Sequence, residues 1–142
     1  MKILSILKQA FKVVELDDAT IKRVAKDESA TLPAILIVGI SSFCGAFGSY
    51  FLPVKYGPVT YRPTLFEAFG HVIVAVFLFL IVVYLLHIAA NYLFKSHGDY
   101  GSLFRVVGHG YIIGFLNVLP VVSILVLLWM LVLIVRILKD VK

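Results

Sequence analysis

An uncharged apolar run constrains the fold of this chain more than any other feature of its sequence. The segment from about Glu67 to Phe94 has "VIVAVFLFLIVVYLL" as its unbroken centre. Such a stretch is typical of a helix that crosses a bilayer, which requires about 20 apolar residues. The whole chain is 61% hydrophobic and only 15% charged, and a water-soluble domain of this size could not bury so much apolar surface. The sequence therefore predicts an all-α, polytopic transmembrane helical bundle.

Four apolar segments reach or approach the length of a membrane span. They cover about residues 32–52, 67–94, 103–119 and 121–138. Only "NVLP" separates the last two, and a structureless break inside lipid would leave backbone groups without partners. We expect a tight turn at Asn117 and Pro120, at the far membrane face. A kink, or a hairpin that does not cross completely, is the alternative.

The basic residues predict how these spans are oriented. Of the 13 Lys and Arg residues, four crossings place only Lys55 and Arg62 on the far face. Lys and Arg concentrate on the cytoplasmic side of membrane proteins. We therefore expect a multi-pass protein of the cell membrane with both termini in the cytoplasm. Residues 1–30 would form a cytoplasmic amphipathic segment, and residues 31–142 a four-helix transmembrane domain.

The N-terminal segment has the pattern of an amphipathic helix at the membrane surface. Apolar residues recur there at helical spacing, with Lys8 and Lys12 on other faces: Leu4, Leu7, Phe11 and Val14. This pattern is typical of helices that lie in the interface plane. A second short helix is expected to begin near Asp18, a residue type that caps helix N-termini. We expect a surface anchor that covers the inner face of the bundle; an element that docks a partner or senses lipid is the alternative.

The loop after the first span, "PVKYGPVTYRP", combines regularly spaced prolines with tyrosines. Prolines oppose helix formation, and tyrosines at this level indicate an interfacial aromatic belt. A ligand site in this loop is the alternative.

Polar residues inside predicted spans are functional candidates because each costs free energy in lipid. Those residues are His71, His87, Asn91, His109 and Asn117. Glu67 and His71 are four residues apart on one helical face and could be half of a metal site, but we expect instead that Glu67 caps its helix and that His71 lies at the headgroups. His71 and His87 are about 24 Å apart along a helix, so they cannot share a haem, whereas His87 and His109 could face each other. A histidine that hydrogen-bonds between helices is the more common outcome, and we expect neither a metal nor another cofactor.

Small residues predict where helices pack closely. Ser41, Gly45 and Ser49 repeat every four residues in the first span, and Gly110 and Gly114 form a GxxxG motif in the third. Such stripes let helix backbones approach each other in lipid. They could serve packing within the chain, which we expect, or dimerisation.

The stretch "GDYGSLFRVVGHGY", residues 98–111, joins two apolar segments and carries Asp99 and Arg105. We interpret it as a helix entrance at the inner interface. Arg105 is expected to extend to the headgroups and to pair with Asp99.

The same region resembles a known family. "HGDYGSLFRVVGHGYIIGFLNVLP", followed by "LLWMLVLIVRILKDVK", is similar to the prokaryotic branch of the Yip family of multispanning membrane proteins. The matching positions are Gly98, Tyr100 to Arg105, Gly110, Tyr111, Pro120, Trp129 and Leu138 to Val141. The resemblance implies a helical membrane protein related to trafficking proteins that bind Rab-type GTPases and shape Golgi and endoplasmic-reticulum membranes. Those relatives usually have five spans, and Rab binding is not transferred to this chain.

Three functions therefore remain open from the sequence. The first is a non-enzymatic membrane-organising protein that acts through helix packing and its cytoplasmic face. Its partners would be the lipid bilayer and further copies of itself or other membrane proteins, with no nucleic acid and no soluble small-molecule substrate. The second is a small oligomeric channel or transporter subunit lined by His87, Asn91 and His109. The third is a haem- or metal-binding membrane protein. The chain carries no P-loop, dinucleotide fingerprint or nucleophile elbow, so we expect no enzyme.

Overall fold

Helices dominate the fold, with a small hairpin between the two longest. The computed structural model describes residues 3–51, 54–56, 58–61, 64–94, 99–119 and 122–140. Along the chain the elements are α1 (Ile3–Val14), α2 (Asp18–Lys26), the 3-10 turn η1 (Glu28–Ala30), α3 (Thr31–Phe51), β1 (Val54–Tyr56), β2 (Val59–Tyr61), α4 (Leu65–Phe94), α5 (Tyr100–Gly110), the 3-10 helix η2 (Tyr111–Val118) and α6 (Ser123–Asp140). The boundary expected at residue 30 lies where η1 gives way to α3.

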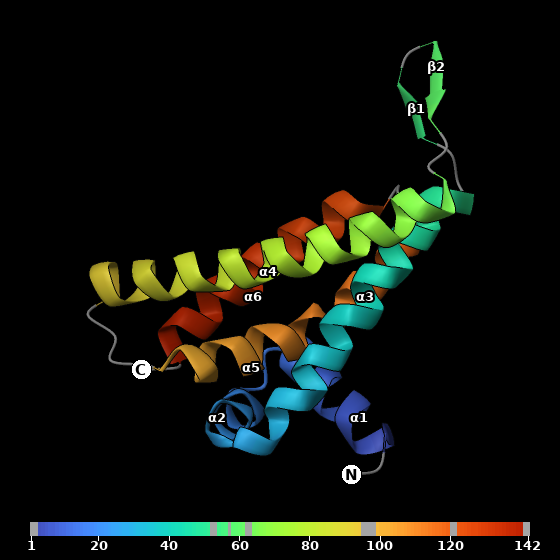
Figure 1. The fold of residues 1–142 in the computed structure, drawn as a ribbon. Coiled ribbons are helices and arrows are strands. Elements are labelled where there is room, and N and C mark those ends of the chain that lie inside the picture. Colours follow the sequence, from blue (N-terminus) through green and yellow to red (C-terminus); the bar gives the residue numbers. More distant parts are fainter. Residues whose placement is uncertain are drawn as a thin grey trace.

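The loop after α3 contains two strands, which the all-α prediction did not include. β1 and β2 pair antiparallel with Val54 opposite Tyr61 and Tyr56 opposite Val59. Valine, threonine and tyrosine favour strands, and Pro58 lies in the connecting turn, where proline's fixed φ suits a chain reversal. The hairpin projects from the end of the molecule where α3 stops and α4 starts (Figure 1).

Two helices of the described chain are long and apolar enough to cross a membrane. The segments that meet this requirement are Glu28–Gly48, largely within α3, and Leu65–Tyr92, within α4. The described part of α6 contributes a shorter apolar helix, Ile124–Ile137. Membrane-spanning length is therefore present for the first two expected spans.

The third expected span is not a single α-helix. α5 ends at Gly110, and the chain continues as the 3-10 helix η2 up to Val118. A 3-10 helix rises about 2.0 Å per residue, so the 8 residues of η2 extend over about 16 Å. The chain resumes as α6 at Ser123, so the expected break after Asn117 is present, while Pro120 itself lies outside the described residues.

The helix α5 forms the centre of the molecule. It contacts α1, α2, α3, α4 and α6, and it lies between α4 and α6 on one side and α1 and α2 on the other (Figure 1). Every residue from Leu103 to Gly110 is buried. The core packed around it draws on all five other α-helices: Val13 of α1, Ile21 and Val24 of α2, Ala34 and Val38 of α3, Phe79 and Val83 of α4, and Leu133 and Ile137 of α6.

The 3-10 geometry of η2 determines which of its residues face α3. A 3-10 helix has three residues per turn, so Tyr111, Gly114 and Asn117 fall in one line. The Ser41 hydroxyl donates to the backbone carbonyl of Tyr111 (3.0 Å). A Cβ atom added to Gly114 would lie 3.2 Å from Ser41 Cβ, and one added to Gly45 would lie 3.5 Å from Asn117 Cβ.

Glycines permit the other close approaches between helices. A Cβ on Gly108 would lie 2.8 Å from Ala34 Cβ, and one on Gly48 would collide with the backbone of Val118. A Cβ on Gly110 would lie 2.8 Å from a methyl carbon of Leu133 in α6. The small residues named from the sequence thus lie where helices of this chain meet, while the side chain of Ser49 lies outside the described part.

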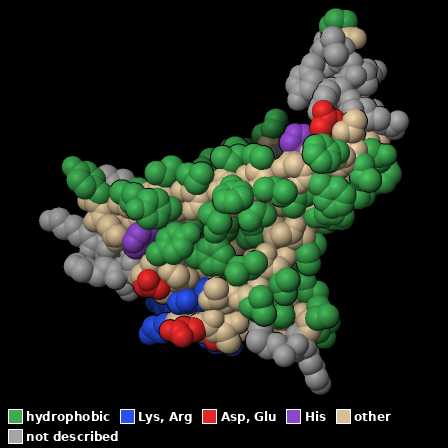
Figure 2. Space-filling model, viewed as in Figure 1, with side chains coloured by type: hydrophobic (Ala, Val, Ile, Leu, Met, Phe, Trp, Pro, Cys, Tyr) green, Lys and Arg blue, Asp and Glu red, His purple; other side chains and the backbone are tan. Residues whose placement is uncertain are grey.

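The surface of the helical layer made by α4 and α6 is apolar. α4 exposes most of its circumference, with Phe66 88% and Phe77 63% exposed, and α6 exposes Ile124 (71%) and Leu125 (66%). Hydrophobic side chains cover much of the face shown in Figure 2, whereas charged side chains gather over α2. An apolar surface of this extent requires lipid rather than water as its solvent.

Candidate functional site

The helices α1 and α2, which we call the N-terminal platform, are attached to the bundle by a buried arginine. The side chain of Arg105 in α5 is 8% exposed. Its Nε donates to the backbone carbonyl of Ala25 in α2 (3.1 Å), its Nη2 donates to the same oxygen, and Nη2 also donates to Ser102 Oγ (3.1 Å). The guanidinium thus satisfies the carbonyl of Ala25 near the end of α2, where α-helices leave such groups unpaired.

Arg105 therefore does not extend away from the protein, as was expected of it. The residue lies one turn into α5, and α2 covers that face of the helix, so its side chain is enclosed before it reaches an interface. Asp99 has a different role from the expected ion pair: its carboxylate caps α5 by accepting from the Ser102 backbone N–H (3.3 Å). A helix does begin in this stretch, at Tyr100; its place at the inner interface stays a prediction.

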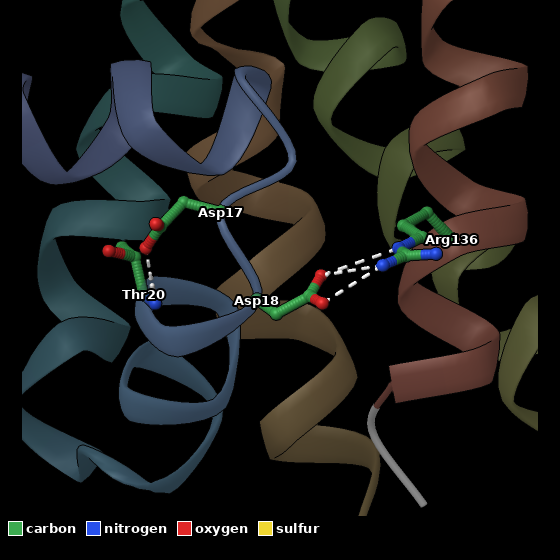
Figure 3. A network of polar contacts seen from close by, with 4 residues as sticks. All are labelled: Asp17, Asp18, Thr20 and Arg136. Atoms are coloured by element: carbon green, nitrogen blue, oxygen red, sulfur yellow. Dashed lines mark hydrogen bonds and ion pairs between the residues drawn. The ribbon is translucent and has the colours of Figure 1, made fainter.

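Contacts from α6 attach the other side of the platform. Arg136 reaches Asp18 at the start of α2, with Nη2 2.9 Å from one carboxylate oxygen and 3.0 Å from the other (Figure 3). The indole N–H of Trp129 donates to the backbone carbonyl of Val14 (3.2 Å). α5 and α6 therefore hold the platform from two directions.

One aspartate caps the start of α2, and a second, just after α2, caps the start of η1. Asp17 caps α2, as its Oδ1 accepts from the Thr20 N–H (2.7 Å) (Figure 3), and Asp27 accepts from the Ser29 hydroxyl (2.6 Å). Hydrogen bonds from Thr20 hold the pKa of the Asp17 carboxyl below its ordinary value. Hydrogen bonds from Ser29 chiefly hold the pKa of the Asp27 carboxyl below its ordinary value, and the positive charge of Arg105 lowers this pKa further.

An apolar stripe on α1 faces away from the bundle. Ala10 and Val13 are buried, whereas Ile3 (76%), Leu4 (78%) and Phe11 (58%) are exposed. Lys8 and Lys12 are exposed on the same helix. α1 therefore has two apolar sides, one packed on the protein and one free among the described residues.

His109 is enclosed in the core rather than facing a pore. The side chain is 0% exposed, and its Nδ1 lies 2.8 Å from the backbone carbonyl of Arg105 one turn earlier. Its Nε2 has no hydrogen-bond partner in the described part of the chain. His87 has other neighbours: its Nε2 lies 3.2 Å from Asn91 Nδ2, and its ring meets that of Tyr100 edge-on. The structure therefore gives these two histidines separate surroundings.

The start of α4 is a reciprocal cap. Glu67 Oε2 accepts from the backbone N–H (2.6 Å) and hydroxyl (2.9 Å) of Thr64, and the Glu67 N–H is within 3.2 Å of Thr64 Oγ1. This is the capping-box arrangement, so the interpretation of Glu67 as a helix cap is confirmed. Among the described residues, no group of three or more His, Cys, Asp or Glu side chains could hold a metal ion.

His71 and Asn117, which are far apart in the sequence, line one small pocket. We call it the polar pocket; it has a volume of about 270 Å³, and its lining includes Ser41, Ser42, His71, Tyr111 and Asn117. The sequence predicted Ser41 as a helix-packing residue, His71 and Asn117 as polar residues within spans, and Tyr111 as a family position. It did not predict that these residues lie together, and it did not indicate Ser42. The spacing of Tyr111 and Asn117 indicates a shared face only for a 3-10 helix, not for the α-helix that was expected.

The polar pocket adjoins a larger apolar space between α4 and α6, which we call the groove. The groove has a volume of about 640 Å³ and shares Gly45, Ala75, Tyr111 and Asn117 with the polar pocket. Its remaining lining is made of apolar side chains of α4, α5 and α6.

Comparison with known families agrees with this architecture. Residues 17–141 match the family model described as the Yip1 domain. No curated protein and no solved structure matches the chain. The match includes α2 to α6, that is, both long apolar helices and the elements that attach the platform. The chain belongs to the Yip1 domain family of membrane proteins.

Proposed function

We propose that this chain is a non-enzymatic, membrane-organising protein whose N-terminal platform binds the cytoplasmic surface of the bilayer beside its own spans. One observation carries the proposal: α1 exposes an apolar stripe while another side of the helix is packed on the bundle. Helices with an apolar face and flanking lysines insert shallowly into the headgroup region. Members of the matched family are generally non-enzymatic trafficking proteins, which is consistent with this role.

The proposed topology has four crossings, with both termini in the cytoplasm. The distribution of Lys and Arg supports it, as does the position of the platform beside the end of α6, where Arg136 meets Asp18. A shallow wedge that is rigidly attached to transmembrane helices occupies area in one leaflet only. Such a wedge is expected to favour curved bilayers.

Reconstitution into liposomes tests this function. The purified full chain is incorporated at increasing protein-to-lipid ratios, and vesicle diameters are measured by cryo-electron microscopy. Wild type is expected to shift the distribution to smaller diameters. The double variant Leu4→Glu/Phe11→Glu, at two exposed positions, is expected to leave the diameters as they are in protein-free liposomes.

Lys22→Gln provides a matched control because it changes charge at an exposed position of α2 without altering the apolar stripe. Its vesicles should have the diameters of wild type. Diameters that do not respond to wild-type protein, or that respond equally to the folded double variant, would refute the proposal.

A further inference from the structure

The side of α2 that faces away from the bundle carries three positive charges. Lys22, Arg23 and Lys26 are exposed, whereas the opposite side of the helix is buried and packs on α5. At 3.6 residues per turn these three side chains fall within an arc of about 100° around the helix. We call them the basic face. Asp18, the acidic residue of α2, lies outside that arc, and charged side chains gather over α2 in Figure 2.

The carboxylates around α2 are already engaged by other groups. Both capping aspartates accept hydrogen bonds from the segments that they cap, and Asp18 is bonded by Arg136. Among the described residues, no carboxylate forms an ion pair with the basic face. Lys22 and Lys26 are also one helical turn apart, and like charges at this spacing repel each other. The basic face therefore favours an anion from outside the protein.

The position of α2 along the bundle indicates where that anion lies. α6 exposes apolar side chains as far as Val135, and the next residue, Arg136, bonds Asp18 in the first turn of α2. Lipid chains can thus contact α6 up to Val135, and the headgroup layer follows at the level of α2. This is the end of the molecule opposite the hairpin (Figure 1).

The neighbouring helix favours a lipid surface as the source of the anion. α1 and α2 contact each other, and both pack on α5 from the same side (Figure 1). α1 exposes Leu4 and Phe11 next to Lys8 and Lys12. A nucleic acid would supply negative charge but no apolar layer for this stripe, whereas a bilayer with anionic lipids supplies both.

We propose that the basic face binds the headgroups of anionic phospholipids in the leaflet on which the platform lies. The inference rests on the proposed function, because it requires the platform to lie at the bilayer surface. The apolar stripe of α1 inserts into the leaflet whatever its charge, and the basic face of α2 makes the platform selective for anionic lipid.

Trp129, the only tryptophan of the chain, is a natural reporter of the lipids beside the platform. Its indole bonds the Val14 carbonyl at the end of α1, and the residue is 39% exposed. The purified full chain is reconstituted into phosphatidylcholine bilayers that contain a minor fraction of a chain-brominated lipid. Bromine quenches tryptophan fluorescence only at short range, so quenching measures the local concentration of the brominated lipid.

Two brominated lipids with the same chains are compared, phosphatidylglycerol and phosphatidylcholine. Wild type should concentrate phosphatidylglycerol near Trp129 by about fivefold over phosphatidylcholine, the effect of one basic residue at an anionic surface. Added salt should reduce this preference because it screens exposed charges.

The triple variant Lys22→Gln/Arg23→Gln/Lys26→Gln removes the charge of the basic face at exposed positions and should remove most of the preference for phosphatidylglycerol. Its matched control, Lys22→Arg/Lys26→Arg, keeps the charge and should retain the preference of wild type. Circular dichroism checks that both variants have the helix content of wild type.

Equal quenching of wild type by the two lipids would overturn the inference and would favour a soluble acidic partner for the basic face. A preference that the triple variant or added salt leaves unchanged would overturn it as well. Vesicle diameters in pure phosphatidylcholine separate this inference from the proposed function, since the triple variant keeps the apolar stripe of α1. It should therefore give wild-type diameters there. Failure of the proposed function would appear as diameters that do not respond to wild type, even where the preference for phosphatidylglycerol holds.

Discussion

The contact between α3 and α5 at Gly108 offers a quantitative test of the packing. A Cβ atom at this position would lie 2.8 Å from Ala34 Cβ and 3.4 Å from Ala34 Cα. Neither atom belongs to a flexible side chain, so Gly108→Ala must push the two helices apart. Overpacking of this kind costs about 1–3 kcal/mol, and replacing glycine in a helix recovers about 0.5–1 kcal/mol. We expect a net loss of about 1–2 kcal/mol in the free energy of unfolding.

The matched control is Gly39→Ala in α3. A Cβ there would have no heavy atom within 4 Å, so only the helix-propensity gain of about 0.5–1 kcal/mol remains. The same chemical change should thus destabilise the protein at one glycine and stabilise it at the other. Heat unfolding in detergent, followed by circular dichroism, measures both.

A double-mutant cycle identifies the atom responsible. Ala34→Gly alone should cost about 0.5–1 kcal/mol, but combined with Gly108→Ala it removes the clash. The pair should therefore be more stable than the sum of the two single changes by the cost of the clash, about 1–3 kcal/mol. Additive losses, or a Gly108→Ala variant as stable as Gly39→Ala, would show that α3 and α5 do not approach each other as described.

The remaining predictions concern how the platform is attached. Arg105→Lys cannot reproduce the forked contact with the Ala25 carbonyl. This variant should lose about 1.5–3 kcal/mol in the free energy of unfolding and should exchange the amide hydrogens of α2 faster. Arg136→Lys alters an ion pair that is nearly half exposed, so it should cost no more than about 1 kcal/mol. Equal effects of the two variants would contradict the buried role of Arg105. The folded-state pKa of Asp17 lies below its ordinary value of 3.8. Its stabilising contribution is thus complete above that value and is lost as the pH falls through the lower, folded-state pKa. Because Asn also caps helices but does not titrate, the difference in unfolding temperature between wild type and Asp17→Asn should change below about pH 4, and a difference that is constant with pH would contradict the cap.

Local features of the fold could be predicted from the sequence because they depend on neighbouring residues. The long apolar run predicted α4, and Asp18 marked the start of α2, whereas α5 begins three residues before the expected Leu103. The break after Asn117 was also predictable, since proline cannot continue a helix. The hairpin was missed because three-residue strands carry too little pattern to be recognised.

The surroundings of the candidate residues could not be predicted in this way. Arg105 finds its acceptor 80 residues away, in Ala25, and no spacing rule connects these positions. Without α2 packed over it, an arginine at the start of an apolar helix would extend to the headgroups. Asn117 lies on the same face as Tyr111 because the chain changes from α-helix to 3-10 helix at Tyr111. The sequence does not show this change; the structure shows it where η2 packs on α3.

The sequence by itself determined that this chain is a helical membrane protein, which apolar segments form its long helices, and to which family it belongs. Composition and periodicity suffice for the first two conclusions because a bilayer accepts only segments of a certain length and polarity, whereas the family follows from the resemblance of the C-terminal third to known members. The tertiary structure decided which polar atoms are buried, which are left without partners, and where α4 and α6 enclose the groove. These properties arise when surfaces from distant segments meet, and the energy of each contact depends on the shape and chemistry of both sides.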